Sequence, residues 1–383
     1  MNFDGRNFSG AGWDLLVREG RAAEFVLLGE EHGTAEIPQL ARELFLALRP
    51  AGFEALAIEI SPPIAQDLDR AARQGLAGVR RFVADFPPGP AFYFWQTEAE
   101  LIAAVRAAAP PGREALWGLD YEVTGDRRLI ERLKAKAPVP ARKALAALDQ
   151  ASASAWAAWR TSHNPGVLFT FAGDPALVRA VSDAWPSPDE DARLILTTLE
   201  ETLEINALFP GQGWDSNERR ARFMRANLVA RLKAAAAEGR HPKVMVKMGE
   251  SHVMRGVNWT GNYDVGALLP EAAELRGGRA FSLLAGGGLN ARRGVLDPSR
   301  MATVPAAVDM LDELGLAFLV AALPPAYKGS GPVLIDLRPL RAIASGAARL
   351  KAFNNPDAVR VIHAVDVMVI WNGTTPARML AEA

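Results

Sequence analysis

The stretch FVLLGEEHGT, residues 25–34, indicates the fold, because an apolar run ends here in two carboxylates and an imidazole. Four apolar residues before a polar cluster are typical of a buried strand that delivers its last side chains into a cleft. Side chains alternate along a strand, so we expect Glu30 and His32 on one face, roughly 7 Å apart, and Glu31 on the other. Glu30 and His32 would then form an acid/base or ligand pair.

A helix and a second strand follow this stretch. Apolar residues at 37, 40, 41, 44, 45 and 48 have the spacing of one helical face, and the PAG sequence at 50–52 ends that helix. Residues 54–61 are again apolar until they reach Glu59. Such a strand, helix and strand form a βαβ unit with parallel strands and a right-handed crossover. Both carboxyl ends then lie at one edge of the sheet, which places Glu59 beside Glu30 and His32.

Two later strands repeat this pattern. Residues 116–122 (LWGLDYE) form a short apolar strand that ends near Asp120, and residues 243–252 (KVMVKMGESH) form one that ends at His252. One strand that ends in an acid is common, whereas several that deliver acids and histidines to one edge indicate a functional site.

The composition narrows the class of protein. The chain has 383 residues, of which 49% are hydrophobic and 23% charged, and its net charge is −1. This composition is typical of a soluble globular protein, and the absence of a basic excess argues against nucleic acid as a partner. There is no cysteine, which excludes thiolate nucleophiles and cysteine metal sites.

The ends and the apolar runs of the chain suggest a compartment. The first residues lack the apolar segment of a signal peptide, and no apolar run is long enough to span a bilayer. We expect no membrane span and a cytoplasmic location, or a periplasmic one if an export signal has been removed.

The pattern predicts one α/β domain over residues 1–383, with a largely parallel sheet flanked by helices. Residues 126–240 are rich in Ala, Leu and Arg and are interpreted as a helical insertion over the carboxyl edge of the sheet. Residues 82–95 are predicted to form an aromatic loop, and His363 to be packed inside a strand. Further strands are expected at 280–284, before a glycine loop at 286–288, and at 316–323, 333–337 and 359–371, with a helix at 340–351.

The strand ends resemble those of the erythromycin esterase-like superfamily, which includes ChaN-like haem-binding proteins and the TraB/Tiki group. The resemblance rests on GEEHGT at 29–34, AIE at 57–59, GLD at 118–120, a late histidine, the Arg-x-x-x-Met-x-x-Asn spacing at 220–227, and the closing strand at 365–372 with its following Thr-Pro. The chain also departs from the esterase pattern. One residue, not two, separates Glu30 from His32, and this spacing resembles the ChaN-like motif. Gly249 stands where esterases carry the first histidine of H-N-x-H. The sequence after Gly249 is closer to the late motif of ChaN-like and TraB-like chains.

The resemblance implies a hydrolase that acts on an ester or amide bond of a small molecule. We favour a mechanism that needs no cofactor. His32, or Glu30 assisted by it, would be the general base toward water. His252 would polarise the carbonyl group or protonate the leaving group. Glu59 would orient the histidines, together with Asp120. The assigned catalytic residues are Glu30, His32, Glu59 and His252, and the supporting residues are Glu31, Asp120, Arg220 and Glu250.

Two alternatives use the same part of the chain. In the first, which the TraB/Tiki resemblance favours, Glu30, His32, Glu59 and His252 are ligands of zinc, manganese or iron with an open position for water. In the second, the chain is a ChaN-like haem carrier without catalysis, with an axial ligand among Tyr93, Tyr121 and Met254.

Overall fold

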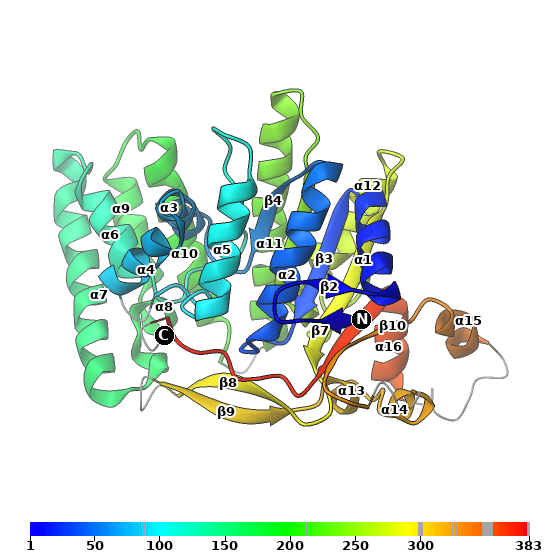
Figure 1. Ribbon diagram of the computed structural model, residues 1–383. Coiled ribbons are helices and arrows are strands. Elements are labelled where there is room, and N and C mark those ends of the chain that lie inside the picture. Colours follow the sequence, from blue (N-terminus) through cyan, green and yellow to red (C-terminus); the bar gives the residue numbers. More distant parts are fainter. Residues whose placement is uncertain are drawn as a thin grey trace.

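A largely parallel sheet forms the centre of the protein in the computed structural model, which describes residues 1–86, 89–210, 213–297, 302–323, 325, 328–346 and 355–380. Its strand order is β10-β11-β7-β3-β6-β4-β5 (Figure 1). Neighbouring strands are parallel except for the β10–β11 pair. The seven strands are β3 (Phe25–Glu30), β4 (Phe53–Ile58), β5 (Leu116–Gly118), β6 (Lys243–Gly249), β7 (Ala280–Gly287), β10 (Gly331–Asp336) and β11 (Val367–Asn372). The predicted α/β class is confirmed.

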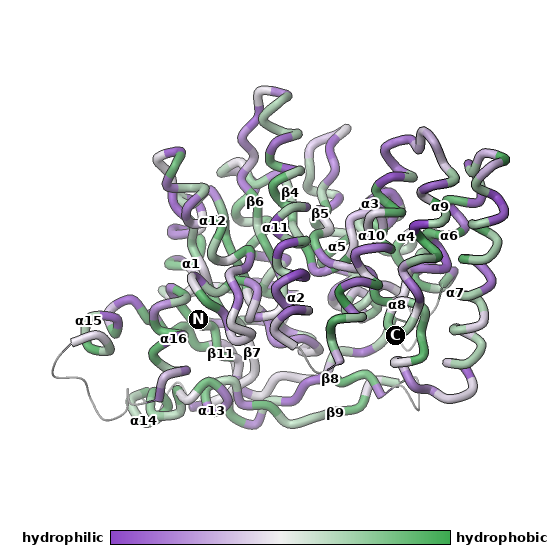
Figure 2. Tube along the Cα trace, turned by 180° about the vertical axis from the view of Figure 1, so that it is seen from behind, coloured by the Kyte–Doolittle hydropathy of each residue, from purple (hydrophilic) through white to green (hydrophobic). Residues whose placement is uncertain are grey.

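Alternating side chains of the central strand pack on opposite faces of the sheet. Val26 and Leu28 belong to the apolar cluster on one face, and Phe25 and Leu27 to the cluster on the other. In Figure 2 the central strands are largely hydrophobic, as expected for a sheet buried on both faces. The first face is covered by α1 (Ala11–Ala22), α2 (Glu36–Leu48), α3 (Pro62–Ala72) and α5 (Gln96–Ala108), and the second by α11 (Gly213–Ala237), α12 (Val265–Glu274) and α16 (Pro356–Ala364).

The segment between β5 and β6 is helical, as predicted for residues 126–240. Its helices are α6 (Asp126–Lys134), α7 (Arg142–Ser162), α8 (Phe169–Ala172), α9 (Pro175–Asp183), α10 (Glu190–Ala207) and α11. The first five gather beside α3 and α4 (Gly75–Asp85), at the β5 side of the sheet (Figure 1). Helix α11 packs on β5 and brings Arg220 to the carboxyl edge. Within the described residues, no helix is long and apolar enough to cross a membrane.

Several predicted elements have a different structure. Residues 316–323 contain helix α14 (Phe318–Ala322), and residues 359–371 divide into α16 and β11, because Asn355 caps a helix that Pro356 begins. His363 is therefore an exposed helix residue bonded to Ser345, and not a packed strand residue.

Three other predicted elements have bounds that differ from the observed ones. The glycines at 286 and 287 continue strand β7, so the predicted glycine loop is wrong there. Phe82 belongs to α4, and the aromatic loop begins after Asp85; residues 87–88 lie outside the described residues. The helix at 340–351 is observed as α15 (Leu340–Ser345), and its predicted end falls outside the described residues.

A hairpin of β8 (Ala291–Asp297) and β9 (Ala302–Val308) lies along the carboxyl edge of the sheet (Figure 1). The backbone of Gly294 in β8 donates to the carbonyl of Gly33, over 2.7 Å. Gly33 has φ 91°, and a Cβ atom there would lie 2.0 Å from the Gly294 carbonyl oxygen. Only glycine allows both this backbone conformation and this close approach. The hairpin thus lies directly against the turn that follows β3.

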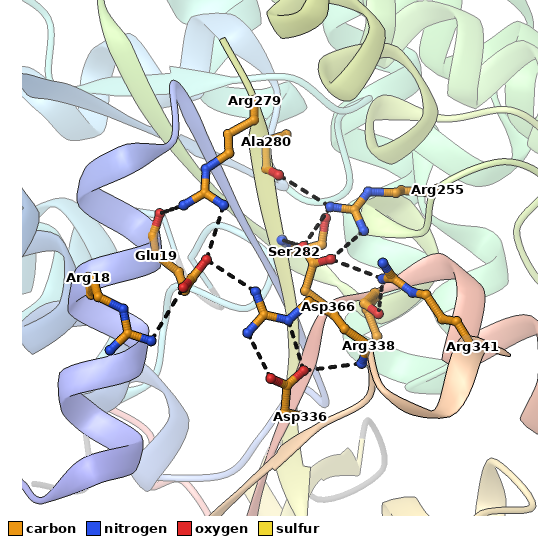
Figure 3. A network of polar contacts seen from close by, with 11 residues as sticks. Arg18, Glu19, Arg255, Arg279, Ala280, Ser282, Asp336, Arg338, Arg341 and Asp366 are labelled. Carbon is orange, nitrogen blue, oxygen red and sulfur yellow. Dashed lines mark hydrogen bonds and ion pairs between the residues drawn. The ribbon is translucent and has the colours of Figure 1, made fainter. Parts of the chain in front are cut away.

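The amino edge of the sheet carries an ion-pair network (Figure 3). Asp366, just before β11, accepts hydrogen bonds from the Ser282 backbone, Arg255 and Arg341 over 2.6–3.0 Å. Arg338 links Asp336 at the end of β10 to Glu19 of α1. These charges are paired with one another and join strands to helices.

The remaining short elements are the β1–β2 pair (Asn2–Phe3 and Phe8–Ser9) and α13 (Met310–Glu313).

Candidate active site

The three predicted acids lie at the carboxyl edge of the sheet. Glu30 is the last residue of β3, Glu59 follows β4, and Asp120 comes two residues after β5. Their exposed fractions are only 3%, 4% and 2%. Strand β6 lies between β3 and β4, so Glu30 and Glu59 come from strands that are not direct neighbours. The edge predicted from the apolar runs is the one observed.

His32 lies between two of these acids. Its Nδ1 atom is 3.0 Å from Oε1 of Glu30, and its Nε2 atom is 3.4 Å from Oε2 of Glu59. Glu31 points to the opposite side, where its carboxylate accepts a hydrogen bond from the Gly287 backbone. The alternation expected from the sequence is therefore observed, and it gives His32 a carboxylate at each ring nitrogen.

His252 approaches the same carboxylate from the other side. It lies in a short 3₁₀ helix (Glu250–Val253) that follows β6, and its Nε2 atom is 3.3 Å from Oε1 of Glu59. Its Nδ1 atom is 2.7 Å from Oδ2 of Asp264. Asp264 caps α12 through its other oxygen, so the helix fixes the position of the carboxylate. Glu59 is therefore the residue that joins the two histidines.

Arg220 closes the group of acids. Its guanidinium donates to both oxygens of Asp120, over 2.9 and 2.5 Å, and to Glu59 over 2.7 Å. Asp120 thus holds Arg220 and does not contact a histidine, unlike the orienting role assigned to it from the sequence. On the same helix, Met224 is buried in the core and Asn227 donates to the Leu119 carbonyl, which explains the spacing of the motif.

A fully buried lysine lies behind Glu30. The ammonium group of Lys247, on β6, is 2.5 Å from Glu30 and 2.6 Å from Glu98 of α5. Burial raises the pKa of the Glu98 carboxyl to about 7, although Lys247 opposes this shift. Lys247, Glu98 and Asp264 were not among the predicted site residues. A lysine in the middle of the apolar run at 243–249 and an aspartate ahead of a helix were the signals that could have identified two of them.

Gly249 leaves room for His32 and Glu59. A Cβ atom at this position would lie 3.1 Å from Nε2 of His32 and 3.3 Å from Oε2 of Glu59. The backbone nitrogen of Gly249 also donates to that Glu59 oxygen, over 2.6 Å. The absence of a side chain here lets the strand end contact the carboxylate directly.

The electrostatics of the site favour protonated histidines. Burial alone would lower the pKa of His32, but Glu59 and Glu30 raise it to about 9. Burial likewise opposes the charge on His252, but Asp264 and Glu59 raise its pKa to about 10. Burial would raise the pKa of Glu59, yet the two histidines hold it well below its ordinary value. At neutral pH the cluster therefore contains two imidazolium groups around one carboxylate.

Glu31 and Glu250 form a separate acidic group. Burial raises the pKa of Glu250 to about 7, and the neighbouring carboxylates of Glu31 and Glu313 add to this shift. Burial also raises the pKa of Glu31, whose Oε1 atom is 3.5 Å from Arg293 of the hairpin. These two acids flank the histidine cluster and make no hydrogen bond or ion pair with either histidine among the contacts of the described residues.

The proposed metal ligands are already occupied by protein groups. Lys247 neutralises Glu30, Arg220 and both histidines neutralise Glu59, and each histidine has both ring nitrogens directed at carboxylates. Within the part of the chain that the structure describes, no three His, Asp or Glu side chains are grouped as metal ligands. A metal ion would have to compete with Lys247 and Arg220, so the donor set does not fit one.

The haem-ligand candidates are placed as follows. Tyr93 and Met254 are almost completely buried, with exposed fractions of 1% and 0%. The Tyr121 ring lies under the Arg220 guanidinium, 5.1 Å from its central carbon. Haem needs an accessible axial ligand beside an apolar slot. These three side chains do not offer that arrangement.

Comparison with known proteins defines the fold further. The sequence matches no protein-family model and no curated protein. A crystal structure of a Bacillus cereus protein covers 98% of this chain and 95% of its own length, with a TM-score of 0.59 and 16% identity. A mutant of the erythromycin esterase EreC in its open conformation covers 96% of this chain and 94% of its own, with a TM-score of 0.59 and 14% identity. The crystal structure of a succinoglycan biosynthesis protein covers 97% of this chain and 93% of its own length, with a TM-score of 0.59 and 16% identity. The chain therefore has an erythromycin esterase-like fold.

Proposed function

We propose that the protein is a hydrolase that cleaves an ester or amide bond of a small molecule by activating water at His32. The observation that carries this proposal is the position of His32 between Glu30 and Glu59, with Glu59 shared by His252. A carboxylate bonded to one ring nitrogen orients a histidine base. Glu30 fills this role at Nδ1, and the second carboxylate, Glu59, lies farther away, 3.4 Å from Nε2. The likeness in fold to an erythromycin esterase supports the same class of reaction.

In this proposal His32 acts in its neutral form. Glu30 accepts a hydrogen bond from Nδ1–H, which keeps the proton on Nδ1 and leaves the Nε2 lone pair to take a proton from water. The 3.4 Å separation between Nε2 and Glu59 is longer than a normal hydrogen bond, so a water molecule at Nε2 would not have to displace a strong bond. The side chain of His32 is 24% exposed, which gives the water access.

In this proposal His252 and Arg220 supply the positive charge that stabilises the carbonyl oxygen during attack. Asp264 and Glu59 raise the pKa of His252 above that of His32, so His252 stays protonated when His32 becomes neutral. A positioned cation of this kind stabilises the oxyanion that forms when water attacks a carbonyl group. His252 can also donate its proton to the leaving group. Ser251 is no rival nucleophile, since its hydroxyl is buried without a hydrogen-bond partner in the structure.

The pH dependence of hydrolysis tests this assignment. With a pKa of about 9, His32 is about 1% neutral at pH 7 and half neutral at pH 9, so kcat/KM should rise about 50-fold between these values. Above pH 10 it should fall, because His252 loses its proton. The measurement is turnover of p-nitrophenyl and amide substrates from pH 6 to 11, corrected with heat-denatured protein. A rate that is constant or falls between pH 7 and 9 would contradict His32 as the base.

A further inference from the structure

The ring of Phe92 covers His32. The two rings are stacked, with their centroids 3.8 Å apart and their planes at 12°. The ring therefore lies flat on one face of the imidazole and covers it. Phe92 and His32 are both partly exposed, so this contact lies at the border between the site and the solvent.

The backbone of Phe92 is in an unfavourable conformation. Its φ angle is 63°, and the other described non-glycine residues with positive φ are His163 and Asn290. For a bulky side chain this region of φ is an outlier that the surrounding structure must impose. The stacked ring is thus held in place at a cost in backbone free energy.

Residues on both sides of Phe92 are fixed to other elements. The Gly89 carbonyl accepts a hydrogen bond from Thr124, and the Phe94 carbonyl accepts one from the Leu380 backbone. Trp95 donates to Thr303 of the hairpin over 3.2 Å. Tyr93, Phe94 and Trp95 are buried, with exposed fractions of 1%, 6% and 4%. Phe92 can therefore leave His32 through a local change, while its neighbours stay in the core.

We propose that the position of the Phe92 ring is a subsite for a planar aromatic group of the substrate, and that such a group displaces Phe92 when it binds. The inference rests on the proposed function, because it takes His32 as the residue beside the reacting bond. An aromatic ligand replaces the stacking contact that is lost when the Phe92 ring leaves. A saturated ring of equal size cannot stack flat on the imidazole and gains less from the exchange.

Ligand binding tests this inference without any need for turnover. The probes are benzamide and its saturated counterpart cyclohexanecarboxamide, and the readout is the NMR shift of the His32 ring protons, assigned with His32→Gln. The chain has five histidines, so these signals can be resolved. We expect benzamide to bind roughly 2- to 12-fold more tightly than cyclohexanecarboxamide, the range of one aromatic stacking contact.

Removal of the competing ring should strengthen binding. Phe92→Gly deletes the ring and suits the positive φ angle, so benzamide should bind roughly 2- to 12-fold more tightly than to the wild type. If Phe92→Gly fails to fold, Phe92→Asn serves instead, because Asn tolerates positive φ. Phe86→Ala is the matched control: its ring stacks with Arg128, and its loss should leave benzamide affinity unchanged.

Two results would overturn the inference: equal binding of both probes, or a ring-deleted variant that binds benzamide no more tightly than the wild type. Hydrolysis of p-nitrophenyl benzoate and p-nitrophenyl cyclohexanecarboxylate is measured in parallel. If neither ester is cleaved although benzamide binds as expected, the proposed hydrolase is wrong and the aromatic subsite stands.

Discussion

Replacing Lys247 with methionine is expected to lower the free energy of unfolding by about 3–5 kcal/mol, the usual cost of removing one partner from a buried ion pair. Lys247 has no exposed surface, and its ammonium group lies 2.5 and 2.6 Å from Glu30 and Glu98. Methionine retains most of the apolar stem but leaves two buried carboxylates without their cation. One of them would have to be protonated or hydrated for the chain to fold.

Urea denaturation at pH 7, compared between variants, measures this effect. Lys243→Met is the matched control, because Lys243 is on the same strand but at its exposed end, where it bonds to the Arg21 carbonyl. We expect this variant to lose less than about 1 kcal/mol. Combining Lys247→Met with Glu98→Gln removes one of the stranded charges and should restore part of the stability. A loss below about 1 kcal/mol for Lys247→Met alone would show that the buried charges do not depend on one another.

His32→Gln is expected to lower kcat/KM for ester hydrolysis by about 10²- to 10⁴-fold, the typical contribution of a general base. The glutamine amide can still hydrogen-bond to Glu30 or Glu59, so the carboxylates keep a partner, but it cannot accept a proton from water. The fold should therefore be retained while the proposed chemistry is lost.

Initial rates on a panel of activated esters measure this loss, with circular dichroism to confirm folding. His241→Gln controls for the loss of a histidine, because His241 is exposed and lies before Pro242, away from the cluster. We expect its rates to equal those of the wild type. A folded His32→Gln variant with rates within twofold of the wild type would remove His32 from the mechanism.

The sequence predicted the edge of the sheet well, for a simple reason. Apolar runs that end in acids can be recognised without any knowledge of neighbouring strands, so Glu30, Glu59 and Asp120 were found together with the parallel direction of their strands. The pairing order could not be found in this way. Nothing in the run at 243–249 indicates that β6 lies between β3 and β4.

The contacts of His252 and Lys247 were harder to predict. Asp264 is 12 residues beyond His252. Glu98, in α5, lies 149 residues before Lys247 in the chain. Such contacts depend on tertiary packing rather than on spacing along the chain. Lys247 was not predicted as a site residue because lysine side chains are ordinarily exposed.

The errors fall in short apolar segments. A run such as 316–323 suits a strand or a buried helix equally well, and its length does not decide between them. For residues 359–371 a signal was present: Asn355 and Pro356 form an N-cap and first helical residue, and they indicate that the segment begins as a helix.

In the proposed mechanism, Glu59 lies between His32 and His252 and sets the protonation of the hydrolytic histidine. The pH profile of kcat/KM for Glu59→Gln tests it most directly. Loss of a carboxylate 3.4 Å from His32 should lower the pKa of the rising limb by about 1–3 units from the wild-type value of about 9. Glu114→Gln, which removes a carboxylate paired with Arg231, should leave the limb in place. We expect the Glu59→Gln profile to shift to lower pH, and a rising limb at the wild-type pH would contradict this role of Glu59.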